Sequence, residues 1–219
     1  MDNQFALHWQ GASTKPLFSS LLQRRLISDA IENTYGLTPD FQAAWLGAPF
    51  DLKAQLKNEG PSKASIQLSV VFHARHAETL QTGLASVASN LELRGLRPQV
   101  KPSAAGTNGQ STVLMWKDKG QSVLGGWSVE SPTPNQISLR LSLGGASASR
   151  PSSSIQTPTS GLRIRFDAKQ LRDLGWLKAT WPRLVQQAGQ GALLLKPMLG
   201  HRSGQTETWY WLKGQLSLR

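Results

Sequence analysis

The sequence predicts an α+β fold, with one or more mainly antiparallel sheets and helices packed on one face. Segments such as 66–73, 136–143 and 162–166 alternate apolar and polar residues, which is typical of strands with one buried face. Residues 18–33 and 75–93 instead repeat apolar residues at intervals of three and four, as amphipathic helices do. The 219 residues are enough to bury a hydrophobic core without covalent cross-links.

The N-terminal part begins with a short strand, expected at 4–10, ahead of the first helix. After that helix we expect Asp40 to cap a short amphipathic turn that contains Phe41 and Trp45. The pattern at 50–57 does not distinguish a strand from a helix. This part therefore supplies a strand, a helix and a capped turn, with one segment undecided.

The central part is dominated by strands. The strand at 66–73 runs directly into the helix at 75–93, which Gly95 can terminate. Four strands are then expected, at 96–101, 112–117, 121–130 and 136–143.

Residues 144–161 are rich in Ser, Gly and Pro and have almost nothing to bury. A structureless segment of this length is uncommon inside one compact unit, so it predicts a linker or hinge. An ordinary surface loop is the alternative. The expected organisation is an N-terminal α+β unit at 1–143, the linker, and a basic C-terminal unit at 162–219.

The C-terminal unit opens with the strand at 162–166, and Asp167 then stands where a helix cap is expected. A helical region and two strands, at 192–198 and 205–218, complete it. The order strand–helix–strand–strand thus occurs twice, once from residue 66 and once from residue 162. This indicates either an internal duplication or an arrangement that is simply common.

Several short segments carry a resemblance to known sequences through their general residue pattern and not through a diagnostic motif. They lie at 44–47, 66–73, 162–167, 171–177, 181–184 and 216–219. On these residues the region 40–219 resembles an uncharacterised family of cyanobacterial proteins of unknown function. Members of that family repeat strand–helix–strand units and often carry a membrane anchor near the N-terminus. The resemblance implies the fold and no particular activity, and this sequence shows no stretch that matches the anchor.

The positive charge is concentrated in the second half of the chain. Of a net charge of +11, residues 1–110 contribute +2 and residues 111–219 contribute +9. Because the excess lies on strand-like segments, it indicates a folded basic surface that meets an acidic partner. The N-terminal residues show no signal-peptide pattern and the sequence has no run of about 18 apolar residues, so we expect a soluble cytoplasmic protein, either free or peripheral to a membrane-bound complex.

The sequence offers little for metal or thiol chemistry. It has no Cys, which excludes disulfides, thiol nucleophiles and Cys-ligated metals. His73, His76 and Glu78 are the one cluster of metal-competent groups, and Arg75 between them would repel a cation. We therefore expect an ordinary strand–helix corner there, and no cofactor.

No catalytic motif stands out either. A Gly-x-Ser-x-Gly elbow is absent, and Gly60–Lys63 lacks the spaced glycine of a phosphate-binding loop. We expect no enzymatic activity. A catalytic site assembled in space would have to use His8 or His201 as its base.

Basic and aromatic residues form the strongest candidate for a functional surface. Arg163 and Arg165 share the polar face of their strand, while Trp209, Trp211 and Lys213 share one face of the last strand. If the two strands adjoin, indoles lie beside guanidinium groups. Such a surface suits an acidic protein partner or single-stranded nucleic acid, or it is cation–π packing with nothing bound.

The leading hypothesis is a non-catalytic interaction or scaffold module that docks on an acidic protein or an anionic surface through these five residues. The alternative is a single-stranded nucleic-acid binder that uses the same face. A third possibility is an enzyme whose site assembles only in the fold. Strong salt dependence from many phosphate contacts favours nucleic acid, whereas affinity retained at high salt favours a protein interface centred on the indoles.

Overall fold

Ten strands and a few short helices make up the described part of the chain. The computed structural model describes residues 5–15, 18, 32–34, 36–57, 62–102, 112–144, 161–177, 180, 183–202 and 205–218. The strands are β1 (Leu7–Gly11), β2 (Phe50–Leu56), β3 (Ala64–His73), β4 (Arg97–Pro102), β5 (Thr112–Lys117), β6 (Val123–Thr133), β7 (Gln136–Leu143), β8 (Leu162–Asp167), β9 (Ala188–Arg202) and β10 (Gln205–Leu218). The helices are α3 (Pro39–Leu46), the 3-10 helix η1 (Ala74–His76), α4 (Ala77–Leu93), α5 (Ala168–Asp173) and α6 (Arg183–Gln187).

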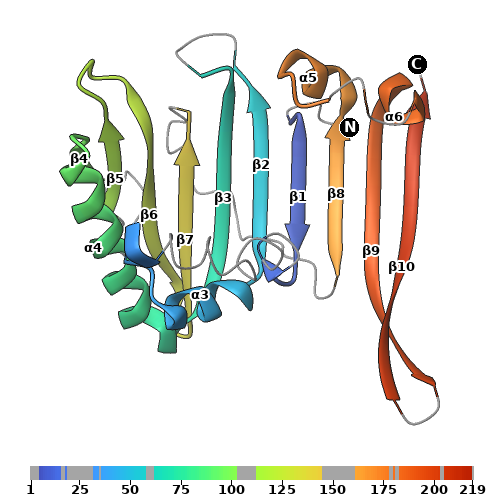
Figure 1. Ribbon diagram of the computed structural model, residues 1–219, viewed down its shortest axis with the longest axis horizontal. Coiled ribbons are helices and arrows are strands. Elements are labelled where there is room, and N and C mark those ends of the chain that lie inside the picture. The colour runs from blue at the N-terminus through green and yellow to red at the C-terminus, as the bar shows by residue number, and fades with distance from the viewer. Residues whose placement is uncertain are drawn as a thin grey trace.

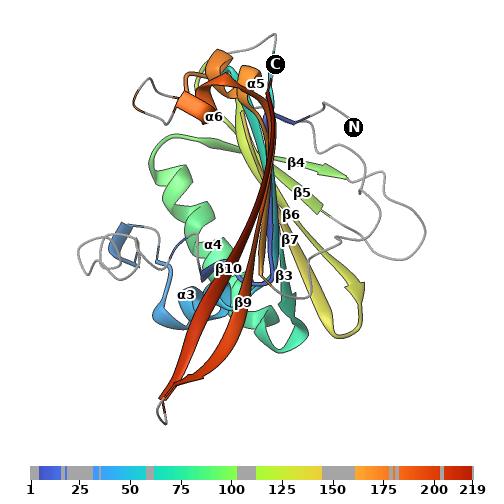
Figure 2. The same ribbon diagram turned by 90° about the vertical axis from the view of Figure 1, so that its right-hand side faces the viewer.

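All ten strands belong to one sheet, in the order β10-β9-β8-β1-β2-β3-β7-β6-β5-β4. Every neighbouring pair is antiparallel. The labelled helices lie on one face of this sheet, as the two views show (Figures 1 and 2). The predicted class is confirmed as an α+β fold, and the sheet dominates it.

Alternation along the strands divides the sheet into two faces. Phe50, Val70 and Leu139 lie opposite one another on β2, β3 and β7, and all three are fully buried in the hydrophobic core. Phe41 and Leu80, from α3 and α4, complete that core. We call this helix-covered side the apolar face and the opposite side, where the intervening residues point, the polar face.

Aromatic packing seats α3 on the apolar face. The Thr38 hydroxyl accepts a hydrogen bond from the Phe41 amide at 3.3 Å and caps the helix. The prediction that Asp40 is the cap was wrong, because the proline before it takes the first helical position and leaves the cap to the preceding hydroxyl. Phe41 stacks on Trp45 at 5.9 Å between ring centres, and Trp45 contacts Phe72 of β3 at 5.8 Å.

Most predicted elements are confirmed with ends shifted by a few residues. The undecided segment 50–57 is β2. Asp167 caps α5 as predicted, since its carboxylate accepts from the Gln170 amide at 3.0 Å. β9 runs from Ala188 to Arg202 and is thus longer at both ends than the strand predicted at 192–198. The helix predicted at 18–33 lies almost entirely outside the described residues.

Strands from both predicted units share the sheet. β1 pairs with β2 on one side and with β8 on the other, so it links strands of the 1–143 region to those of the 162–219 region. The interior of the predicted linker, 145–160, lies outside the described residues. The two proposed repeats are placed differently, because β8, β9 and β10 are consecutive neighbours whereas β7 and β6 separate β3 from β5 and β4. Separate units and a duplication therefore stay predictions.

The contact between α3 and α4 depends on a glycine. We expect Gly83→Ala to lower the free energy of unfolding by about 1–3 kcal/mol, since an added Cβ would overlap the buried Phe41 ring. This loss should exceed the gain in helix propensity. Urea unfolding measures it, and Gly47→Ala is the control, because a Cβ there meets no atom within 4 Å. Equal stability of Gly83→Ala and wild type would contradict this packing.

Candidate functional site on the polar face

Basic side chains gather on the polar face across β8, β1 and β2. Arg165, His8 and Lys53 lie opposite one another on these three strands. Two residues along each strand, the next row on the same face consists of Arg163, Gln10 and Asp51. Both arginines are exposed, while His8 and Lys53 are half-buried. We call Arg163, Arg165, His8 and Lys53 the basic strip.

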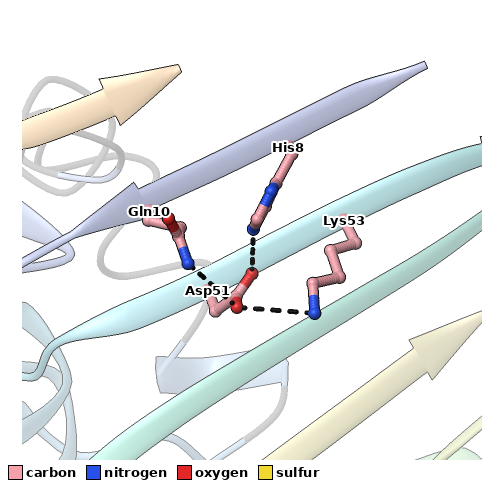
Figure 3. A network of polar contacts seen from close by, with 4 residues as sticks. All are labelled: His8, Gln10, Asp51 and Lys53. Atoms are coloured by element: carbon pink, nitrogen blue, oxygen red, sulfur yellow. Dashed lines mark hydrogen bonds and ion pairs between the residues drawn. The ribbon is translucent and has the colours of Figure 1, made fainter. Parts of the chain in front are cut away.

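Asp51 is the acid that pairs with His8 and Lys53 of the basic strip (Figure 3). His8 Nε2 lies 2.9 Å from Asp51 Oδ1, and Gln10 Nε2 donates to Asp51 Oδ2 at 3.3 Å. Lys53 Nζ lies 3.6 Å from the same Oδ2. The ammonium group of Lys53 is also 5.5 Å from the centre of the Phe5 ring. The carboxylate thus holds three nitrogen donors from two adjacent strands in fixed positions.

The environment of Asp51 keeps its carboxylate ionised. Burial acts to raise the pKa of Asp51, but the hydrogen bond and charge of His8, followed by the charge of Lys53, lower that pKa below its ordinary value of 3.8. A general acid near neutral pH needs the opposite shift, toward a raised pKa. Asp51 is therefore suited to orient its neighbours rather than to exchange protons.

His8 satisfies part of what an assembled catalytic site would need, because it lies beside a carboxylate. Among the described residues, however, no hydroxyl group is hydrogen-bonded to His8. The side chain of His201 lies outside the described part of the structure. The geometry around His8 thus resembles an ion-pair network more closely than a nucleophile with its base.

The sequence-predicted site residues share one face but do not adjoin. β9 lies between β8 and β10, so Arg163 and Lys213 are opposite Leu194 from its two sides. Trp211 is opposite Lys196 of β9. The pairing of β9 with β8 ends one residue earlier, at Leu195. The condition for direct contact between indoles and guanidinium groups is therefore not met.

The last strand is exposed on both faces. Trp211, on the polar face, is 50% exposed, and Leu212 and Leu216, on the opposite face, are 61% and 39% exposed. β10 is also an edge strand, and its hairpin with β9 extends beyond the rest of the sheet (Figure 1). An edge that carries large exposed apolar side chains is a surface on which another chain can pair. The side chain of Trp209 lies outside the described part of the structure.

Sequence reasoning missed the Asp51 network. His8 was considered only as a possible base, and its partner lies 43 positions away. The alternation of His8 with Gln10 and of Asp51 with Lys53 is a detectable signal, since polar residues two apart share a face of a strand. The sequence does not say that these two strands pair, so the four side chains could not be brought together.

Comparison with protein-family models, curated proteins and solved structures finds no match to this chain. The resemblance to a cyanobacterial family accordingly stays a prediction. In the described residues no helix is long and apolar enough to cross a membrane. The functional argument therefore rests on the geometry of the polar face.

Replacing the central acid tests the network. We expect Asp51→Asn to lower the free energy of unfolding at pH 7 by about 1–3 kcal/mol, because His8 and Lys53 lose a buried ionised partner. The lowered pKa of Asp51 stabilises the fold above pH 3.8, and this stabilisation is lost as the pH falls through the folded-state value. The difference from wild type should therefore shrink below about pH 4.

Urea unfolding at pH 7 and at pH 3 measures this difference. The control is Asp173→Asn, which neutralises an exposed acid at the end of α5 and should change stability by no more than about 0.5 kcal/mol. A deficit for Asp51→Asn that is the same at both pH values would show that the carboxylate charge is not what stabilises the strip.

Proposed function

We propose that this chain is a non-catalytic interaction module that docks on an acidic protein through the polar face of β8, β9 and β10. The observation that carries the proposal is the exposure of Arg163 and Arg165 on the same face as Trp211 and Lys213. Among the described residues neither guanidinium is engaged in an ion pair. Their charges are thus available to a partner.

Each part of the surface has a distinct physical role in this proposal. The arginines supply long-range attraction, because uncompensated charge on a folded face raises the rate of encounter with an acidic partner. Trp211 supplies apolar contact area, and indoles are among the residues that contribute most to binding energy. Lys213 extends the surface along β10. The anionic surface of a membrane-bound complex in the cytoplasm would present the same complementary charge.

A protein partner is favoured over single-stranded nucleic acid by the shape of this region. Binding without sequence preference relies on aromatic side chains on which successive bases stack. In the described part of the chain, Trp211 is the exposed aromatic side chain on this face, and a strand separates it from Arg163. The free edge of β10 offers backbone groups that an extended peptide can pair with, which a nucleic acid cannot use in this way.

Charge reversal tests the basic strip. We expect Arg163→Glu/Arg165→Glu to lose capture of acidic proteins from native lysate and to weaken binding of polyglutamate at low salt by at least about tenfold, since each substitution turns attraction into repulsion. Biolayer interferometry at low and moderate salt measures the affinity for polyglutamate. The matched control is Arg97→Glu/Lys119→Glu, which makes the same charge change at exposed positions near the opposite edge.

Repeating the capture after nuclease treatment of the lysate distinguishes a protein partner from a nucleic acid. Capture that disappears after nuclease treatment, together with tight salt-sensitive binding of a poly-dT oligonucleotide, would replace the protein partner by single-stranded nucleic acid. Equal losses in both charge-reversal variants would show that net charge alone, and not this face, governs binding.

Trp211 tests the apolar part of the interface. We expect Trp211→Ala to weaken binding of a captured acidic protein at moderate salt by about tenfold or more, because the exposed indole loses its contact area. The free energy of unfolding should change by less than about 1 kcal/mol, since half of this side chain is already exposed. Titration calorimetry and urea unfolding on the same preparations measure both. A large loss of stability would instead identify Trp211 as a packing residue.

A further inference from the structure

A cavity of about 640 Å³ lies at one end of the sheet, away from the basic strip. It is bounded by α3, by the junction of β3 with η1 and α4, and by the first residue of β7. Its size falls in the range of pockets that hold small organic molecules. None of the residues of the basic strip, and none of those assigned to the docking surface, line it.

Backbone hydrogen bonds fix the walls of this cavity. The Val71 amide donates to the Pro49 carbonyl at 3.0 Å, which ties the end of β3 to the segment that leads into β2. The Ala74 amide donates to the Asn135 carbonyl at 3.0 Å and ties η1 to the β6–β7 turn. The cavity is thus formed by the fold itself and needs no rearrangement before a ligand enters.

One wall of the cavity is basic. His73, Arg75 and His76 all line it at the junction of β3 and α4. Arg75 Nε donates to His76 Nε2 at 3.2 Å, which holds the two side chains side by side. Among the described residues no acid pairs with Arg75. The same junction offers the Thr79 hydroxyl and the Gln136 amide as further donors.

The opposite wall is mostly apolar. Ala43 and Ala44 of α3 line it, and so does Asp40 from the first turn of that helix. Asp40 is the one acid among the lining residues, and it would repel an anion placed beside it. An anionic group is therefore expected at the His73–Arg75–His76 wall, and an apolar body against the alanines.

We propose that this cavity binds a small organic phosphate. A phosphate monoester carries close to two charges and several acceptor oxygens, so it can use together the terminal N–H groups of Arg75, a ring N–H of each histidine and the neutral donors. A carboxylate would be satisfied by Arg75 alone. This site is independent of the docking surface proposed above, and the presence of either does not require the other.

Gly47 is a lining position at which a larger side chain can be introduced without a close clash at its Cβ. It lines the cavity at the end of α3, its φ is −82°, and an added Cβ meets no atom within 4 Å. Any side chain is therefore compatible with this backbone conformation. A phenylalanine at this position would project into open space, whereas an alanine would change little.

Isothermal titration of the full chain with phenyl phosphate tests the proposal. We expect saturable binding to one site with a Kd below about 1 mM, and weaker binding of inorganic phosphate, which lacks the apolar body. Arg75→Gln should weaken binding of phenyl phosphate by about tenfold or more, the loss expected for one charge-assisted hydrogen bond. Gly47→Phe should abolish it, while the distant Arg97→Gln should bind as wild type does.

Circular dichroism and urea midpoints verify that each variant is folded. If Gly47→Phe is not, Arg75→Gln and the amide NMR shifts of Thr79 and Gln136 on titration decide the matter. The proposal is overturned if wild type does not bind phenyl phosphate at millimolar concentration. It is equally overturned if Arg75→Gln and Gly47→Phe bind normally while Arg163→Glu/Arg165→Glu does not, because the phosphate then sits on the basic strip.

Discussion

The pairing of β1 with both β2 and β8 is the interaction on which the described architecture depends. This five-residue strand is the only connection, within the described sheet, between the strands from residues 50–143 and those from 162–218. Gly11 makes the fit possible, because a Cβ there would overlap the Phe50 ring. The same strand places His8 and Gln10 on the polar face, opposite Asp51 and its neighbours. A single short segment therefore completes both the core and the candidate site.

The two faces of the sheet are stabilised by different physical means. On the apolar face, a row of fully buried side chains packs beneath α3 and α4, and the gain comes from removing apolar area from water. On the polar face, cationic groups lie close together, and their repulsion is offset by the ionised Asp51 and by Glu130, which lies 3.4 Å from Arg140. Asp51 pairs with His8 and Lys53, whereas the described residues contain no acid paired with Arg163 or Arg165. The positive charge that no acid pairs with in the described residues therefore lies on β8, on the side of the sheet that leads to the β10 edge.

The edge at β10 and the cavity beside α3 are separate features with separate uses. At the edge, unpaired backbone groups and exposed Trp211 and Leu212 favour a large partner that can cover an extended strip of surface. The cavity has a volume of about 640 Å³, a size that suits a small organic molecule. Binding at one does not block the other, since they lie on different elements. On the two proposals, a small ligand and a protein partner would occupy different parts of the sheet.

Local pattern in the sequence determined the secondary structure and the two faces of most strands. Two kinds of feature depend on neighbouring residues only, so they can be recognised without the fold. They are the alternation in 66–73, 136–143 and 162–166 and the cap at Asp167. The His8–Asp51 pair and the placement of β9 between Arg163 and Lys213 cannot be recognised in this way. Strand order and register bring together residues far apart in the chain, and no local pattern encodes which strands adjoin. The sequence by itself therefore predicted that Arg163 and Arg165 share one strand face and that Trp211 and Lys213 share another, and only the tertiary structure decided which of these residues are neighbours.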